Sequence, residues 1–261
     1  MQKLGQHFLR NQSVIVRIVE ALEIGRGDTI VEIGPGHGEL TISLARECAQ
    51  KKARLIAIEK DGKLAAELSD RIRAAGMENL EIISGDIFDF LGSYRVPRDS
   101  SVKFVGNLPY YITGHLLKIL GELKPRPERS IFMVQKEVAE RMVAEPPTMN
   151  RLAASIRFWN NPKIIARISK KDFIPPPKVD SAVIAMKTKD SDFSMDAERY
   201  YTAVRVLFAQ PRKTILNNIS VVSNDSKKNI TEKLLQISID SKVRPQNLSI
   251  EDIVAVAKSL F

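Results

Sequence analysis

The chain has 261 residues, 44% of them hydrophobic, and its 40 lysines and arginines against 31 aspartates and glutamates give a formal net charge of +9. This composition excludes a chain that is disordered throughout, and the length allows one large domain or a large domain with a small one attached. No run approaches the roughly 18 apolar residues of a membrane span, and the first residues lack the apolar core of a secretory signal, so we expect a soluble cytoplasmic protein. A single cysteine, Cys48, rules out an intramolecular disulfide, and three scattered histidines give no metal-ligand spacing, so we expect no metal site.

Short apolar runs alternate with segments of helical periodicity over the first two thirds of the chain. The runs predict strands at 29–33, 54–58, 80–83, 102–105, 130–134, 164–168 and 182–186, with helices at 40–50, 62–75, 114–122 and 136–144. This alternation predicts an α/β fold with a doubly wound, largely parallel sheet. After residue 189 the strand signal stops and the pattern predicts helices at 197–208, 212–221, 227–235 and 249–260. We therefore expect a first domain over 1–189 and a small helical domain over 190–261.

The positive charge is concentrated in the middle third of the sequence. Residues 117–189 hold 15 basic and 7 acidic side chains, whereas residues 1–116 hold 15 of each. A local surplus of this kind is typical of a surface that binds the phosphate backbone of a nucleic acid. A solvated basic face explains it equally well, so charge alone leaves both interpretations open.

Polar residues and glycines follow the first three predicted strands. Gly34, Gly36 and Gly38 form a turn that opens a helix, Glu59 ends the second strand, and Asp86 follows the third. Each has a purely structural explanation, since such turns pack helices on strands and acids cap helices. Together they describe a nucleoside pocket, in which Glu59 accepts from ribose hydroxyls and Asp86 from an exocyclic amine. Glu39 stands where the dinucleotide-binding fingerprint G-x-G-x-x-G has its last glycine. This difference favours S-adenosylmethionine over a cofactor with a diphosphate.

The fourth strand runs into the most specific motif of the chain, Asn107-Leu108-Pro109-Tyr110. This motif resembles the target-amine motif of adenine N6-methyltransferases. An Asn oxygen and the neighbouring carbonyl can accept from the N–H groups of an exocyclic amine, proline fixes the direction of that carbonyl, and the tyrosine offers a stacking face. The alternative is an ordinary Asn-Leu-Pro turn that ends a strand.

Three further segments narrow the resemblance to the ribosomal RNA adenine dimethyltransferases: LGQHFL at 4–9, FIPPPKVDS at 173–181 and FAQPRKTILNN at 208–218. The resemblance covers almost the whole chain and implies a Rossmann-like methyltransferase domain with a helical RNA-recognition domain. It implies that the protein uses S-adenosylmethionine to dimethylate two adjacent adenosines near the 3′ end of small-subunit ribosomal RNA and acts in subunit biogenesis. It places around the cofactor His7, Leu9, Gly34, Glu59, Asp86 and Asn107, and around the target base Asn107, Leu108, Pro109, Tyr110 and Phe173.

The sequence departs from the family pattern at several of these positions. His7 stands where many members have Asn, Met149 and Asn150 replace a usual Tyr-Gly pair, and Pro211 replaces the first arginine of an R-R-K-T motif. The loss of that arginine shifts expected RNA contacts toward the middle basic segment. The RNA-contact candidates are Arg141, Arg151, Lys178, Arg212 and Lys213.

Two alternative functions remain open beside the leading one, and we expect a monomer in each case. The first is methylation of a large-subunit adenosine of the type that confers macrolide resistance; the RPQNLSIED ending resembles the small-subunit enzymes more closely. The second is a binding factor for RNA or ribosome assembly without catalysis. An intact Asn-Leu-Pro-Tyr motif and both pocket acids favour catalysis over this alternative.

Overall fold

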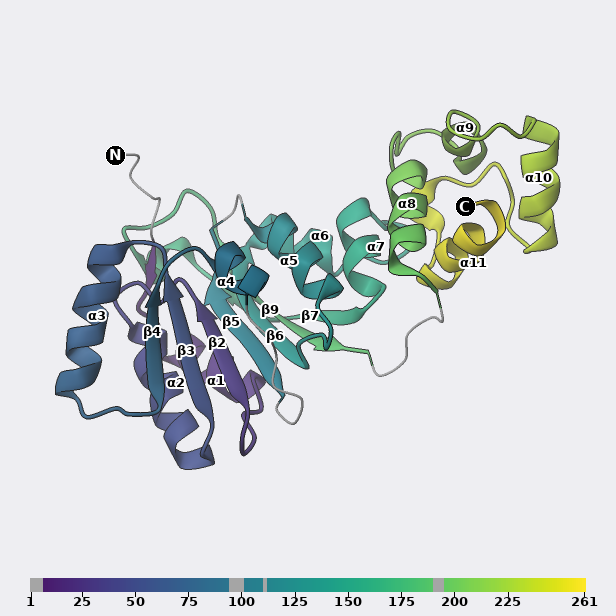
Figure 1. The fold of residues 1–261 in the computed structure, drawn as a ribbon. Helices are drawn as coiled ribbons and strands as arrows, with labels where there is room; N and C mark the ends of the chain where they lie inside the picture. The colour runs from purple at the N-terminus through teal and green to yellow at the C-terminus, as the bar shows by residue number, and fades with distance from the viewer. Residues whose placement is uncertain (1–6, 94–100, 110–111, 190–194) are drawn as a thin grey trace. The chain divides into compact units, whose positions relative to one another are not determined.

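The computed structural model describes residues 7–93, 101–109, 112–189 and 195–261 (Figure 1). The chain forms two compact units. The first comprises residues 1–139 and 163–188, and the second comprises residues 140–162 and 189–261. The functional domain boundary at residue 190 stays a prediction; the second compact unit also takes in residues 140–162 from the middle of the sequence.

A seven-stranded sheet has the order β4-β3-β2-β5-β6-β9-β7. The parallel part consists of β2 (Thr29–Ile33), β3 (Arg54–Glu59), β4 (Leu80–Ser84), β5 (Val102–Asn107) and β6 (Arg129–Gln135). β9 (Ser181–Thr188) runs antiparallel to β6, and β7 (Asn160–Ile168) completes the sheet. The central strand β2 is buried at every position, as expected for a sheet covered on both faces. The predicted α/β fold and all seven strands are confirmed.

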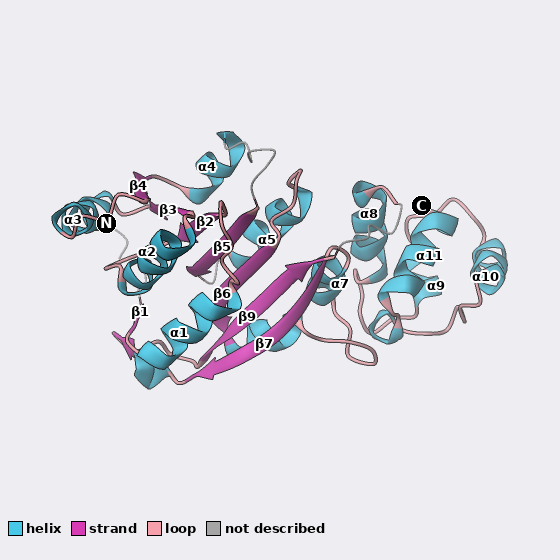
Figure 2. Ribbon diagram, turned by 90° about the horizontal axis from the view of Figure 1, so that it is seen from below, coloured by secondary structure: helices cyan, strands magenta, loops and turns pink. Residues whose placement is uncertain are grey.

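Six helices accompany these strands: α1 (Gln12–Ala21), α2 (Glu39–Lys51), α3 (Gly62–Ala74), α4 (Ile87–Ser93), α5 (Thr113–Glu122) and α6 (Lys136–Met142). Figure 2 shows α1 and α2 on one face of the sheet and α4 and α5 on the other. The sequence reading missed α1, although its apolar residues Val14, Ile15 and Ile18 have helical spacing and all are buried. Its preceding Asn11 caps the helix by accepting from the N–H groups of Ser13 and Val14.

A second, two-stranded sheet joins the start of the chain to a distant segment. β1 (Phe8–Leu9) pairs antiparallel with β8 (Phe173–Ile174), so that Leu9 lies opposite Phe173. A 3₁₀ turn over Lys170–Asp172 leads into β8. Two further hydrogen bonds extend this junction, from Arg10 N to Asp172 O (2.9 Å) and from Asn11 Nδ2 to Asp172 Oδ1 (3.2 Å).

The second unit is built from helices: α7 (Arg151–Arg157), α8 (Ala197–Leu207), α9 (Ile215–Ile219), α10 (Lys227–Gln236) and α11 (Ile250–Leu260). A 3₁₀ turn, Pro245–Asn247, precedes α11. Tyr200 of α8 is fully buried, stacks on Phe158 with ring centroids 3.9 Å apart, and donates to the Ala154 carbonyl. The buried tyrosine therefore joins α8 to α7 and explains why residues 140–162 belong to this unit.

The expected helix over 212–221 is wrong in its bounds, because α9 begins only at Ile215. Thr214 is its N-cap, accepting from Asn217 N, and the side chain of Asn218 bonds back to the main chain of Gln210. Arg212 and Lys213 therefore lie in the turn before the helix. Farther along, α11 begins with a capping box between Ser249 and Asp252.

In the described part of the chain, no helix is long and apolar enough to cross a membrane. The same residues contain no cluster of three or more histidines, cysteines, aspartates or glutamates able to hold a metal ion. Cys48 is buried in α2, and burial raises the pKa of its thiol to about 12, so it is a packed side chain rather than a nucleophile.

Candidate functional site

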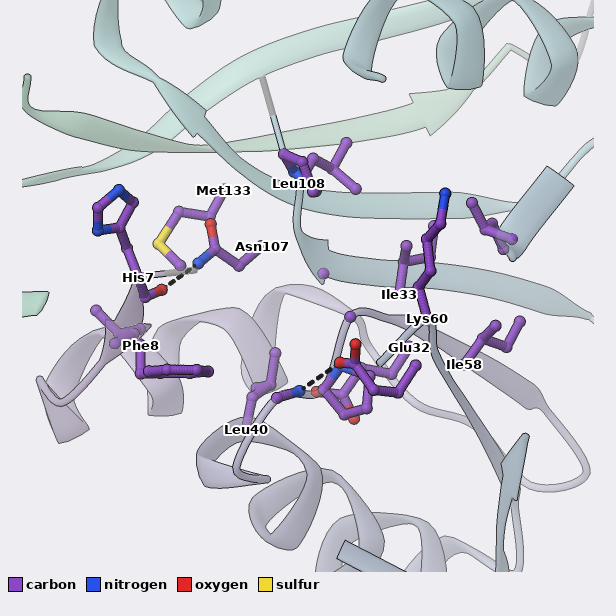
Figure 3. Close-up of a pocket in the computed structure, with 18 of the residues that line it drawn as sticks. His7, Phe8, Glu32, Ile33, Leu40, Ile58, Lys60, Asn107, Leu108 and Met133 are labelled. Atoms are coloured by element: carbon purple, nitrogen blue, oxygen red, sulfur yellow. Dashed lines mark hydrogen bonds between the residues drawn. The ribbon is translucent and has the colours of Figure 1, made fainter. Parts of the chain in front are cut away.

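A cavity of about 430 Å³ opens at the carboxyl ends of the parallel strands, where ligands of such sheets bind (Figure 3). Its lining comes from the ends of β2, β3 and β5, from the segment after β4, and from the β1–β8 ribbon. The volume lies in the range of small-molecule sites. Every described residue that the sequence analysis placed around the cofactor or the target base lines this cavity: His7, Leu9, Gly34, Glu59, Asp86, Asn107, Leu108, Pro109 and Phe173.

The glycine turn after β2 forms one wall of the cavity. Gly34, Gly36 and Gly38 all have positive φ, at 67°, 58° and 87°. Residues other than glycine rarely adopt such angles. A Cβ on Gly36 would come within 2.6 Å of the Phe8 ring. The turn therefore brings the main chain close to the cavity and leads directly into α2, whose first residues Glu39 and Leu40 also line the cavity.

Glu59 ends β3 and is fixed by two main-chain donors. Its Oε2 accepts from Gly36 N at 3.0 Å and its Oε1 from Asp61 N at 2.9 Å, and the residue is 4% exposed. A carboxylate has about four acceptor positions, so each oxygen keeps one for a ligand. The arrangement suits a pair of neighbouring hydroxyls, as on a ribose.

Asp86 lies two residues after the end of β4 and is held by a cation and a main-chain donor. Lys60 Nζ is 2.8 Å from Asp86 Oδ2, and Phe88 N donates to Oδ1 at 2.9 Å. The bond from the Lys60 ammonium lowers the pKa of the Asp86 carboxyl. Asp86 is therefore an ionised acceptor at the mouth of the cavity, as an exocyclic amine requires.

Glu32 lies in β2 beneath the glycine turn and is 2% exposed. Burial raises the pKa of its carboxyl to about 8, with Glu59 and Glu39 adding to the shift. Its Oε2 is buried and finds no hydrogen-bond partner in the described protein, although the residue lines the cavity. An unsatisfied buried acceptor in a cavity wall is a position where a ligand donor is favoured.

Asn107 is the last residue of β5, and a neighbouring main-chain carbonyl fixes its side chain. Asn107 Nδ2 donates to His7 O at 2.8 Å (Figure 3). Because a carbonyl only accepts, this bond directs the amide nitrogen to His7 and leaves Oδ1 as the free acceptor. Within the described residues, Asn107 Oδ1 makes no hydrogen bond.

The residues on either side of Asn107 hold it at the cavity. A Cβ on Gly106 would overlap the Ile33 carbonyl on the neighbouring strand, so only glycine fits there. Leu108 is 1% exposed and its N–H donates to Met133 O at 3.0 Å. The Pro109 carbonyl accepts from Ile112 N at 3.1 Å, starting the turn into α5. Tyr110, the fourth residue of the motif, lies outside the described residues.

The three ribbon residues that sequence analysis singled out have different surroundings. Phe173 is 2% exposed and Leu9 7% exposed, and both belong to the apolar core as well as to the cavity wall. His7 uses its carbonyl on Asn107 and its ring on the main chain, since Nδ1 donates to Pro175 O at 2.7 Å. These bonds tie the His7 carbonyl and Nδ1 to the protein.

The five RNA-contact candidates are all exposed. Arg141, Arg151, Arg212 and Lys213 belong to the second unit, and Lys178 belongs to the first, in the segment that follows the cavity residue Phe173. Asn150, one of the departures from the family pattern, caps α7 and donates to Arg141 O at 2.8 Å.

Sequence analysis missed three residues that shape the cavity. Lys60 directly follows Glu59 and pairs with Asp86. Phe8 packs its ring on His37, with centroids 4.2 Å apart, and against Gly36. Gly106 is required by the β2–β5 contact. Phe8 lies within the quoted LGQHFL segment and Lys60 directly follows Glu59, so the sequence offered a signal for both, whereas the need for Gly106 is visible only in the strand register.

These observations test whether S-adenosylmethionine fits the cavity. The close main-chain approach at Gly36, the spare acceptors of Glu59 and Asp86 and the orphaned Glu32 oxygen match a ligand with hydroxyl, amine and ammonium donors. No cluster of lysines or arginines for a diphosphate faces these groups among the lining residues, where Lys60 is paired with Asp86. The donor set therefore fits the nucleoside and amino-acid parts of that cofactor.

Comparison with known proteins adds four findings. A family model described as ribosomal RNA adenine dimethylase matches residues 1–261. The ribosomal RNA small subunit methyltransferase A of Dehalococcoides mccartyi is 35% identical over 251 residues, which cover 95% of this chain and 84% of the relative. The crystal structure of a dimethyladenosine transferase from Plasmodium falciparum is 26% identical and superposes with a TM-score of 0.80 over 95% of each chain. A 23S rRNA methyltransferase, ErmE, superposes with a TM-score of 0.75 over 97% of this chain and 99% of its own at 24% identity, which shows that the fold is shared.

Proposed function

Because the chain belongs to the ribosomal RNA adenine dimethylase family and is therefore an S-adenosylmethionine-dependent adenine dimethyltransferase, we propose that Asn107 and its neighbours present the target amine of small-subunit ribosomal RNA. The substrate is two adjacent adenosines near the 3′ end of that RNA, modified during subunit assembly. The observation that carries the site assignment is the Asn107 carboxamide, whose oxygen is left free at the cavity. The shared fold of ErmE gives no preference between ribosomal subunits, whereas the curated relative is a small-subunit enzyme.

The residues divide the work between two parts of the cavity. Glu59 and Asp86 hold the nucleoside of the cofactor, and the turn at Gly34 and Gly36 lets it approach the main chain. His7 and Leu9 also line the cavity. S-adenosylmethionine supplies, when bound, an electrophilic methyl group on a sulfonium.

Methyl transfer to the target adenine depends on hydrogen-bond acceptors for its amine rather than on a residue that removes a proton. Asn107 Oδ1 and the Leu108 carbonyl accept from the N6 amine, which turns the nitrogen lone pair away from conjugation with the ring. One N–H proton leaves the nitrogen after methylation, so no strong base is needed. For the second methyl group the amine carries one N–H fewer, and a single acceptor holds it. Tyr110 and Phe173 provide the aromatic faces for the base.

RNA binding is assigned to the exposed cations. Arg141, Arg151, Arg212 and Lys213 on the second unit, with Lys178 on the first, offer phosphate contacts. The enzyme works as a monomer in the cytoplasm, where ribosomal subunits are assembled. Each lost phosphate contact is expected to lower the salt dependence of RNA binding by about one unit of slope.

The proposal is tested by transfer of labelled methyl groups to immature small subunits that lack the modification, with large subunits as the control substrate. The wild-type enzyme is expected to form dimethyladenosine on small subunits alone. Asn107→Ala is expected to lower kcat by about 10² to 10³-fold, the cost of removing one preorganised hydrogen-bonding group. Its matched control, Asn229→Ala, changes an exposed side chain of α10. Product on large subunits only, or full activity of Asn107→Ala, would contradict the proposal.

A further inference from the structure

His7 connects two segments that approach the cavity from distant parts of the chain. Its main-chain oxygen accepts from Asn107 Nδ2 at 2.8 Å, and its ring Nδ1 donates to the Pro175 carbonyl at 2.7 Å. Asn107 is 100 residues away in the sequence and Pro175 is 168 residues away. Figure 3 shows the His7 carbonyl facing the Asn107 amide, with the imidazole directed away from it.

The bond to His7 decides which atom of Asn107 is available to a substrate. A carboxamide has a donor end and an acceptor end of nearly equal shape, and in isolation either end can face a ligand. The His7 oxygen accepts but cannot donate, so it attracts Nδ2 and would repel Oδ1. No other hydrogen bond to the Asn107 side chain occurs within the described residues. The acceptor role of Asn107 therefore depends on where the His7 carbonyl lies.

The imidazole ring holds that carbonyl in place. On the chain after His7, the β1–β8 pairing and the Arg10 to Asp172 bond fix the main chain. At His7 itself, the ring bond to Pro175 is the contact that ties the residue to the segment following Phe173. Because Pro175 O only accepts, Nδ1 carries the proton in this arrangement. The β1–β8 pairing after His7 and the ring bond at His7 together keep the His7 carbonyl from shifting away from Asn107.

We propose that His7 is a positioning residue for methyl transfer: its ring, bonded to Pro175, holds its carbonyl against Asn107 Nδ2 and so presents Oδ1 to the substrate amine. This inference rests on the proposed function of Asn107. It gives His7 a role beside its place in the cavity wall, since Nδ1 and the carbonyl of His7 are both engaged with the protein.

The test compares His7→Ala with His7→Asn in the holoenzyme assay on immature small subunits. His7→Ala is expected to lower kcat by about 10 to 100-fold, since small misplacements of a reacting group cost up to about that factor. The Kd for S-adenosylmethionine and the KM for the subunit should stay within about twofold. His7→Asn is expected to recover most of the loss, because Asn Nδ2 occupies nearly the position of His Nδ1 and donates to the same carbonyl. Gln12→Ala, an exposed first residue of α1, is the control and should match the wild type.

A double variant separates this inference from the function on which it rests. If His7 acts through Asn107, adding His7→Ala to Asn107→Ala should lower kcat no further. Full activity of the single variant Asn107→Ala would contradict the proposed function of Asn107 itself, whatever the His7 variants show. With Asn107→Ala inactive, four results would each overturn the His7 role: wild-type kcat in His7→Ala, a raised cofactor Kd with unchanged kcat, failure of His7→Asn to recover activity, or additive losses in the double variant.

Discussion

The cavity has a cofactor half around Glu59 and Asp86 and an acceptor half around Asn107. The hydrogen bonds that build the two halves join residues at very different separations along the chain. In the cofactor half, the bonds that place Glu59 and Asp86 join residues 2, 23 and 26 positions apart. In the acceptor half, the bonds around His7, Asn11 and Asn107 join residues 100, 161 and 168 positions apart. The cofactor half is thus made by consecutive strand and helix units, whereas the acceptor half exists only when the chain start meets the β8 segment. Changes in the first half should alter cofactor affinity, and changes in the second should alter the rate of transfer.

The largest effect is expected at Gly106, which lies where the two halves meet. Replacing Gly106 with alanine places a Cβ against the Ile33 carbonyl, so β2 and β5 must separate. Overpacking of this kind costs about 3 kcal/mol of unfolding free energy, and it should weaken cofactor binding and transfer together. Urea denaturation and the methyl-transfer assay measure the two losses. In the control Gly114→Ala, the new Cβ has nothing within 4 Å, and stability should be unchanged or slightly higher. Equal stability of the two variants would contradict the assigned clash.

Glu59→Gln should affect the cofactor half alone. The glutamine amide can accept from only one of the two N–H donors, Gly36 N and Asp61 N, and leaves the other buried and unpaired. The amide nitrogen also cannot accept from a ribose hydroxyl, and the loss of that contact costs about 2 kcal/mol of binding free energy, which corresponds to a Kd for S-adenosylmethionine raised about 30-fold. With saturating cofactor, kcat should stay near the wild-type value. Calorimetric titration measures the Kd, and Glu67→Gln, on the exposed side of α3, is the matched control. A lower kcat with unchanged Kd would place Glu59 in the acceptor half instead.

The same contrast explains how much of the molecule the sequence predicts. Alternating strands and helices are local patterns, so the seven strands are found with bounds close to those observed, and Glu59 and Asp86 are placed at strand ends. The pairing of β1 with β8 involves two residues on each side and leaves no periodicity to detect. The orientation of Asn107 and the role of His7 follow from that pairing, so they become visible only in three dimensions. Likewise, the assignment of residues 140–162 to the helical unit depends on the buried Tyr200 contacts.

The smallest effect concerns Glu32, which lies under the glycine turn and lines the cavity shared by both halves. Burial raises the pKa of its carboxyl from an ordinary value of 4.5 to about 8. Between these values the folded protein holds a proton that the unfolded chain releases, so the free energy of unfolding falls as pH rises, by about 1.4 kcal/mol per pH unit from this group. Urea denaturation without cofactor at pH 6 and pH 7 measures that slope. Glu32→Gln keeps a neutral side chain at every pH and should remove this contribution, whereas Glu67→Gln should keep the wild-type slope. If Glu32→Gln retained the full wild-type slope, the carboxyl would already be ionised in the fold, and the unpaired Oε2 would be a charged acceptor rather than part of a protonated acid.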